Sequence, residues 1–215
     1  MLFDLTIIGF GVIGAETLHG IKKKLLNQKI KIKRKFKIAI IEKNLKNIPG
    51  GVAYSQENSK YGYFNNPLRL SHPDFIKWFN LNQNKRRILN FSKKNLSYNL
   101  SSWANKNEIF LNQKYNDYKE IYLPRLIYSF YLKDKISQFL NLKKKLNISL
   151  NIFRGEANQI KNNKYYSIYP NRSFNEFVIN LDKEKLKIKK KNDSKDFKII
   201  KTKTLIIGTG VVPPK

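Results

Sequence analysis

The feature that most constrains the fold is the segment GFGVIG near the amino end, which has the spacing G-x-G-x-x-G and directly follows a run of apolar residues. Asp4 and Glu16 interrupt the apolar stretch around this motif, and no basic region precedes it. A membrane-spanning helix needs about 20 apolar residues, so neither a membrane anchor nor a secretory signal is expected here. We therefore expect a soluble, cytoplasmic protein in which this run is a short buried strand that ends in a glycine turn.

The residues around the motif predict a strand, a helix and a second strand. Residues 2–9 are an apolar run that ends in glycine, which is typical of a buried parallel strand. Residues 12–28 change to helical spacing, and residues 36–43 form another strand-like run with Glu42 at its carboxyl end. Together these elements predict a βαβ unit with a right-handed crossover. The apolar stripe of the helix is expected to contain Ile13, Leu18, Ile21 and Leu25.

Within this unit each glycine of the motif has its own physical role in binding a dinucleotide. Gly9 permits a tight turn, Gly11 lets the backbone approach a pyrophosphate, and Gly14 lets the helix lie close to the strand. The pyrophosphate would face the free N–H groups and the dipole of the helix amino end. Glu42 would accept hydrogen bonds from ribose hydroxyls, and the lysine-rich segment 29–35 explains its longer than usual distance from the motif. A glycine-rich turn in an unrelated α/β domain is the alternative.

The side-chain inventory excludes several kinds of chemistry. The chain has no cysteine, so it has no disulfide, no zinc–thiolate site and no cysteine nucleophile. Its two histidines are too few for a histidine-built metal site without help from carboxylates, and His72 is interpreted as a loop residue before a proline. We therefore expect no metal.

The charge of the chain is strongly positive, because 43 lysines and arginines face 15 acidic residues and give a formal net charge of +28. The densest basic clusters are residues 22–37 and 183–203, and such a field attracts nucleic acid or anionic lipid. Lysine, asparagine and isoleucine nevertheless dominate the whole chain, and no RNA-binding signature is visible. We predict diffuse charge, no specific nucleic-acid binding and no membrane span.

The middle of the chain departs from the repeated βα units of an ordinary dehydrogenase. Residues 48–79 are punctuated by glycine and proline, and residues 80–117 are polar and rich in asparagine. Residues 122–146 predict an amphipathic helix that begins at Pro124. Its apolar positions are Leu126, Phe130, Leu132, Ile136 and Phe139.

The last third of the chain predicts mostly strands. Residues 147–160 predict a third parallel strand that continues into an extended segment. Residues 164–203 alternate short apolar runs with polar breaks, which favours a β-meander. Residues 204–210 predict another buried strand that ends in glycines.

Four pieces of the sequence, taken in order, carry a family resemblance. They are GFGVIG, GGVAYS followed by FNNP, YLPRLIYSFYL, and LIIGTGVVPP. They are similar to motifs in the amino-terminal, FAD-binding part of bacterial FAD/NAD(P)-binding proteins, relatives of the flavin monooxygenases and of glutathione-reductase-like flavoproteins. The resemblance implies a single α/β, Rossmann-like FAD-binding domain over residues 1–215, with a parallel sheet, a helical insertion at about 50–120 and a β-meander at about 156–203.

The same resemblance implies a set of cofactor-binding residues. Gly9, Gly11 and Gly14 would hold the FAD pyrophosphate, and Glu42 would hold the adenosine ribose. The other candidates are Gly50 and Gly51, which would line the cofactor, Arg125 beside the flavin-binding groove, Ala157 facing the adenine through its backbone, and Gly208 and Gly210 passing under the dinucleotide. A simple turn is the alternative for Gly50 and Gly51, and a surface charge or salt-bridge partner is the alternative for Arg125.

The functional expectation is an FAD-binding domain of an oxidoreductase, with NAD(P)H as co-substrate. Thr204 and Gly208 replace the acidic residue and the alanine that are more usual around the terminal strand of the family, and the family's later glycine-aspartate stretch is absent. We therefore expect an incomplete flavoprotein that uses a partner chain, and we nominate no catalytic acid or base. The alternatives are an NAD(P)-binding oxidoreductase domain and a non-catalytic basic protein that binds RNA or membrane.

Overall fold

The computed structural model divides the chain into two compact units, which we call the sheet unit and the helical unit. The sheet unit consists of Met1–Gly51 and Leu132–Lys215, and the helical unit consists of Val52–Tyr131. The structure describes residues 1–54, 62–94, 98–182, 185–191 and 196–210. The VVPP segment of the family resemblance, residues 211–214, therefore lies outside the described residues.

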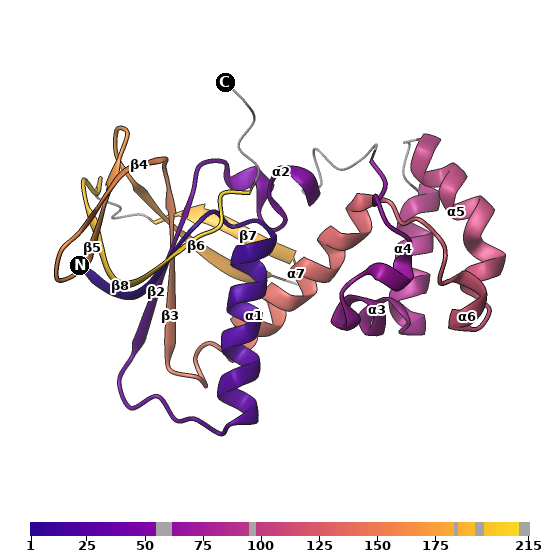
Figure 1. Cartoon of the computed structure of the whole chain (residues 1–215), viewed down its shortest axis with the longest axis horizontal. Helices are drawn as coiled ribbons and strands as arrows, with labels where there is room; N and C mark the ends of the chain where they lie inside the picture. Colours follow the sequence, from indigo (N-terminus) through magenta and orange to yellow (C-terminus); the bar gives the residue numbers. More distant parts are fainter. Residues whose placement is uncertain (55–61, 95–97, 183–184, 192–195, 211–215) are drawn as a thin grey trace. The chain divides into compact units, whose positions relative to one another are not determined.

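The described residues of the sheet unit form an eight-stranded sheet with the strand order β4-β5-β8-β1-β2-β3-β6-β7 (Figure 1). The four central strands, β8, β1, β2 and β3, are parallel to one another. The strand bounds are β1 Leu2–Ile8, β2 Phe36–Glu42, β3 Ile148–Arg154, β4 Ala157–Asn162, β5 Tyr166–Pro170, β6 Asn175–Asp182, β7 Lys185–Lys190 and β8 Ile200–Ile207. The predicted parallel sheet is confirmed.

Strands β1 and β2 are buried because their sequences are nearly continuous apolar runs, as expected for strands covered on both faces. In β2, for example, Ile38, Ala39, Ile40 and Ile41 are all buried, and Phe3 of β1 meets Phe153 of β3 edge to face at a centroid distance of 5.7 Å. Since parallel strands point the same way, their carboxyl ends lie along one edge of the sheet.

The prediction of a buried strand at residues 204–210 is only partly correct. Strand β8 alternates exposed lysines with buried Ile200 and Thr202, and its last residue, Ile207, is 57% exposed.

The antiparallel strands expected between residues 156 and 203 form two hairpins on opposite sides of the parallel core. The hairpin β4–β5 pairs with β8, and the hairpin β6–β7 pairs with β3. The last of the four predicted meander segments, residues 196–201, instead leads into β8 through Ile200. Strand β7 is at the edge of the sheet, and its lysine-rich sequence discourages pairing with other chains.

Two predicted helices are confirmed as α1 (Val12–Asn27) and α7 (Arg125–Leu142). Within the sheet unit, α1 and the second half of α7 lie side by side. Lys135 donates to both oxygens of Glu16 at 2.9 and 2.7 Å, and Lys22 donates to Gln138 at 2.7 Å. Burial lowers the pKa of Lys22, and the nearby Lys135 charge lowers it further.

The predicted apolar stripe of α1 is only partly correct. Leu18 is fully buried, whereas Ile13 is 48% exposed. Ile13 follows the glycine turn by two residues, so it lies at the open amino end of the helix rather than over the middle of the sheet. The helical spacing of apolar residues in a sequence shows which side of the helix faces the sheet, but not which turns of the helix the sheet covers.

Asp4 of β1 is the centre of an ionic cluster that joins three strands. Its carboxylate forms a bidentate pair with Arg34, accepts the backbone N–H of Lys37 at 3.0 Å and pairs with Lys203 of β8 at 3.2 Å. Only 6% of Asp4 is exposed. The hydrogen bonds from Arg34, Lys37 and Lys203 outweigh burial and hold the pKa of the Asp4 carboxyl well below its usual range.

The helical unit is built from short helices (Figure 1). Aromatic side chains form its core. Phe75 is central to this core, with ring centroids from 4.9 Å away at Tyr128 to 6.2 Å away at Phe79. His72 is the N-cap residue of the helix α3 (Pro73–Phe79), because its Nδ1 accepts the Asp74 N–H at 3.2 Å, which agrees with a structural role. The helices are α2 Gly51–Tyr54, η2 Leu68–Leu70, α3 Pro73–Phe79, α4 Asn82–Lys94, α5 Tyr98–Leu111 and α6 Tyr115–Tyr118, followed by the first turns of α7.

Candidate dinucleotide-binding site

The candidate site lies in the sheet unit, where the parallel strands end and glycines follow three of them. Backbone hydrogen bonds continue past the strand ends in a regular series. Gly208 donates to Ile8 at 2.8 Å, Gly9 donates to Ile41 at 2.8 Å, and Gly155 donates to Glu42 at 3.1 Å. These bonds hold the loops after β8, β1, β2 and β3 next to one another, at the edge where ligands bind in open α/β sheets.

Gly9 and Gly14 are required by backbone geometry. Gly9 has φ +91°, and a Cβ there would overlap the carbonyl oxygen of Gly208. A Cβ at Gly14 would lie 2.7 Å from the Gly9 oxygen and 2.9 Å from Cδ2 of Phe10. These two glycines therefore allow the tight turn and the close packing of α1 that the sequence motif predicts.

Gly11 lies against the second glycine motif of the sequence. A backbone bridge joins Gly11 to Gly50, and a Cβ on Gly11 would lie 3.4 Å from the Gly51 backbone. Gly50 and Gly51 have φ +124° and +65°, so both occupy conformations that favour glycine. The structure thus brings the glycine motif next to Gly50 and Gly51, and a Cβ on Gly11 would make van der Waals contact with the Gly51 backbone.

The amino end of α1 has the arrangement that suits an anion. Gly11 is the N-cap residue and has no side chain to satisfy the first backbone N–H groups of the helix. The helical hydrogen bonds begin when Ala15 donates to the Gly11 oxygen at 3.1 Å. The preceding N–H groups are left for a ligand, and the helix dipole adds to their attraction for negative charge.

Glu42 is fixed beside this turn by two backbone donors. Its Oε2 accepts the N–H of Phe10, inside the glycine motif, at 2.8 Å, and its Oε1 accepts the N–H of Asn44 at 2.9 Å. Phe10 is completely buried, so the donor is held rigidly. A carboxylate has about four acceptor positions, which leaves capacity for ribose hydroxyls.

The remaining candidates of the sheet unit occupy the neighbouring strand ends. A Cβ on Gly208 would lie 2.9 Å from the Ile13 side chain, so this glycine allows α1 to approach β8. Gly210 has φ +73° and faces open space. Ala157 begins β4, pairs with Pro170 and packs against the apolar cluster that includes Phe174.

Arg125 belongs to the helical unit, where it fixes the segment that contains FNNP. Its backbone N–H donates to Gly62 at 2.8 Å, its Nε donates to the Tyr63 oxygen at 2.9 Å, and its Nη2 donates to Asn65 at 3.2 Å. Within the described part of the chain it forms no salt bridge with a carboxylate. The geometry thus gives Arg125 a local structural role through carbonyl and amide acceptors.

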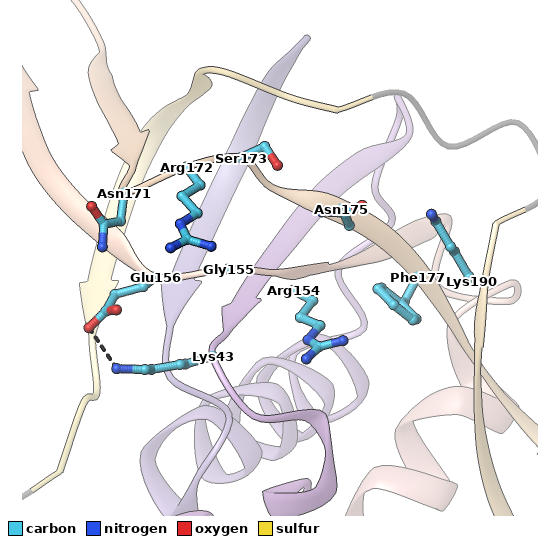
Figure 2. A pocket seen from close by; sticks show the side chains of 10 residues that line it. All are labelled: Lys43, Arg154, Gly155, Glu156, Asn171, Arg172, Ser173, Asn175, Phe177 and Lys190. Atoms are coloured by element: carbon cyan, nitrogen blue, oxygen red, sulfur yellow. Dashed lines mark hydrogen bonds and ion pairs between the residues drawn. The ribbon is translucent and has the colours of Figure 1, made fainter.

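The structure adds a pocket that the sequence motifs did not identify. It has a volume of about 580 Å³ and opens beyond the carboxyl ends of β2 and β3 (Figure 2). Its lining residues are Lys43, Arg154, Gly155, Glu156, Asn171, Arg172, Ser173, Asn175, Phe177 and Lys190. A sequence signal did exist, since Lys43 directly follows β2 and the pair Arg154–Gly155 ends β3, but the positions from 171 onward come together only in the fold.

Two negative findings apply to the described residues alone. They contain no group of three or more histidine, aspartate or glutamate side chains placed to hold a metal ion. No helix among them is both long and apolar enough to cross a membrane.

The glycine turn, the uncapped helix and the acidic strand end define a Rossmann-like dinucleotide-binding protein. A comparison with protein families matches residues 6–173 to the family described as FAD-NAD(P)-binding, and the chain belongs to this family. The matched region contains Gly9 to Gly51, Arg125 and Ala157, and it ends before β6. A comparison with curated proteins found no match. The family resemblance seen in the sequence is confirmed, and the cofactor is a flavin or nicotinamide dinucleotide.

Proposed function

We propose that this chain is the FAD-binding domain of a flavin-dependent oxidoreductase. The observation that carries the proposal is the Glu42 carboxylate, held 2.8 Å from the Phe10 N–H of the glycine turn. A carboxylate in this place accepts hydrogen bonds from free ribose hydroxyls and repels a ribose phosphate. It therefore favours FAD or NAD over NADP. The antiparallel strands between β3 and β8, which a simple NAD domain does not need, favour FAD.

Each candidate residue has a proposed task in holding the dinucleotide. Backbone N–H groups at the start of α1 bind the pyrophosphate, and Glu42 orients the adenosine ribose. The proposed backbone contacts come from Gly9, Gly11, Gly14, Gly50, Gly51, Ala157, Gly208 and Gly210. When bound, FAD supplies hydride and electron transfer chemistry, with NAD(P)H as the proposed donor. The chain's own part is to bind and orient, and we assign no side chain as acid or base.

The helical unit, Val52–Tyr131, is proposed to be an insertion in a single dinucleotide-binding domain. Both the chain before it and the chain after it contribute to the one sheet, since β2 precedes it and β3 follows it. This is the relation expected of an insertion between two strands that pair directly.

The test is a calorimetric titration of the same protein preparation with FAD, NAD and NADP. We expect FAD to bind most tightly and NADP to bind weakest, because of the Glu42 carboxylate. A clearly tighter complex with NADP would overturn the flavin assignment. The same titrations on Glu42→Ala test the role of the carboxylate. Glu120→Ala is the control for that variant, because it removes an exposed carboxylate of the helical unit and changes the net charge equally.

A further inference from the structure

A basic surface lies at the amino ends of the parallel strands, at the edge of the sheet opposite the glycine turn. It contains the connection from α1 to β2, residues 28–35, and the turn from α7 to β3, residues 143–147. These segments are adjacent, because the Phe36 N–H donates to the Asn147 oxygen at 3.0 Å and the Asn147 amide donates to the Ile32 oxygen at 3.2 Å. Figure 1 shows both at the lower end of the sheet unit. We call these two segments and the last turn of α1 the amino-end surface.

The charged side chains of the amino-end surface are all cationic. The chain contains no aspartate or glutamate within residues 17–41 or within residues 135–155. Asp4 of β1 forms a bidentate pair with Arg34 and neutralises its charge. Burial lowers the pKa of Lys143, and the charge of the next lysine lowers it further. The exposed cations of the surface are Lys24, Lys29, Lys31, Lys33, Arg34, Lys35, Lys144 and Lys145.

Two aliphatic side chains project from among these cations, since Leu26 and Ile30 are each 43% exposed. Backbone hydrogen bonds fix their positions at the end of α1. The Lys29 N–H donates to the Leu26 oxygen at 3.2 Å, and the Ile30 N–H donates to the Leu25 oxygen at 3.1 Å. Lys29 has φ +51°, the left-handed conformation that commonly ends a helix. The surface therefore presents apolar side chains at fixed places among lysines.

This combination of side chains indicates the chemistry of the partner. Lysines attract the anionic headgroups of a lipid bilayer without a directional requirement, and exposed aliphatic side chains insert at the boundary between headgroups and acyl chains. Sites for single-stranded nucleic acid instead combine cations with aromatic rings on which the bases stack. Residues 24–35 and 143–147 contain no aromatic residue. The amino-end surface thus fits an anionic bilayer better than it fits a nucleic acid.

We propose that the amino-end surface docks this protein on an anionic lipid bilayer. The exposed lysines contact the headgroups, and Leu26 and Ile30 insert between them. Such binding is peripheral and needs no membrane-spanning helix. It goes beyond the proposed FAD binding and does not rest on it. Because the glycine turn lies at the opposite edge of the sheet, docking leaves the candidate dinucleotide site uncovered.

The first test measures co-sedimentation of the protein with phospholipid vesicles at about 0.15 M salt. One set of vesicles contains phosphatidylcholine alone, and the other contains phosphatidylserine as a minor component. The charge variant is K31Q/K33Q/K144Q/K145Q. Its control removes exposed lysines from other parts of the chain and is K77Q/K94Q/K106Q/K189Q. Both variants change the net charge equally, so a difference between them reports the surface and not the overall field.

The second test separates a bilayer from other polyanions by removing apolar side chains without changing the charge. The variant is L26S/I30S, and its control is L70S/I109S, which removes an exposed leucine and an exposed isoleucine of the helical unit. A single-stranded oligonucleotide is the additional probe, measured by fluorescence anisotropy. Circular dichroism and FAD titration of every variant report folding and the glycine-turn site separately.

The wild type is expected to bind vesicles with phosphatidylserine at least about 10-fold tighter than neutral vesicles, and the charge variant is expected to lose this advantage while its control keeps it. L26S/I30S should weaken vesicle binding at least about 3-fold and leave oligonucleotide binding unchanged, and L70S/I109S should change neither.

Three results would each overturn the inference. They are equal binding to both kinds of vesicle, equal weakening by the charge variant and its control, and vesicle binding by L26S/I30S that equals that of the wild type. An oligonucleotide that binds the wild type more tightly than the anionic vesicles do, and that the charge variant no longer binds, would assign the surface to nucleic acid instead. Failure of the wild type to bind FAD would contradict only the proposed function.

Discussion

At the residue scale, the account depends most on Glu42. Its carboxylate joins the end of the second strand to the glycine motif by accepting the Phe10 N–H at 2.8 Å. We expect Glu42→Ala to weaken FAD binding by about 1–3 kcal/mol, the scale of a lost hydrogen bond to a charged group. Titration of the variant with FAD measures this loss. Binding equal to that of the wild type would place the Glu42 carboxylate outside the ribose site, and Glu120→Ala should bind as the wild type does.

Asp4 gives a second prediction at the residue scale, this one on pH. Because the folded state lowers the pKa of Asp4, the unfolded state binds more protons in acid. The ion pairs of Asp4 therefore stabilise the fold fully above the ordinary aspartate pKa of about 4, and their contribution declines as the pH falls below it. Asp4→Asn should lower the free energy of unfolding by about 1–3 kcal/mol at neutral pH and by progressively less in acid. Urea unfolding at several pH values measures both, and a loss that is independent of pH would contradict this role.

At the scale of elements, three parallel strands end in a glycine, and these glycines let the following loops meet at one edge. We expect Gly9→Ala to lower the free energy of unfolding by about 1–3 kcal/mol, because a side chain at φ +91° is strained and its Cβ would overlap the Gly208 oxygen. Gly20→Ala is the matched control. Gly20 lies in α1 with open space at its Cβ, so alanine there should raise the free energy of unfolding by about 0.5–1 kcal/mol. Denaturant unfolding of both variants tests this, and equal effects would contradict it.

The parallel core and the helices α1 and α7 were predictable from the sequence because each presents one strong local pattern. The four residues 38–41 are apolar without interruption, and the glycine motif marks where the first strand ends and the helix begins. The helices of residues 82–111 were not predicted, since asparagine and lysine obscure the apolar positions at Ile88, Trp103 and Leu111, which are buried in the fold. The arrangement of the last strands as two separate hairpins could not be predicted from the sequence either. The sequence of a short strand with alternating polar and apolar residues does not show which other strand it pairs with.

In the candidate site, too, some features could be predicted from the sequence and others could not. The tight turn at Gly9 and the close helix packing at Gly14 follow from a motif whose geometry is local, and the structure has both. The ribose contact of Glu42 stays a prediction. The cationic pocket was missed because Arg154 and Arg172 are separated by a hairpin and carry no shared sequence pattern. In a chain with 43 basic residues, no single arginine is distinctive until the fold shows which of them share a cavity.

At the scale of the whole molecule, the net charge of +28 predicts non-specific attraction to any polyanion. We expect binding to single-stranded oligonucleotides that falls steeply with added salt and shows no preference for sequence, because phosphate contacts alone would hold the complex. Fluorescence anisotropy over a range of salt concentrations, with two unrelated sequences, measures this. A salt-resistant complex with one sequence would contradict it and favour a specific nucleic-acid site.

The central claim, that this chain is an FAD-binding domain, is tested most directly by the amount of flavin that it retains. The purified protein is incubated with excess FAD, separated from free cofactor by gel filtration, and denatured so that the released flavin is measured against the protein. The account predicts about one FAD per chain for the wild type, consistent with the single glycine motif, and much less for Glu42→Ala. A wild-type protein that folds but retains no flavin, under conditions where it still binds NAD or NADP, would contradict the account.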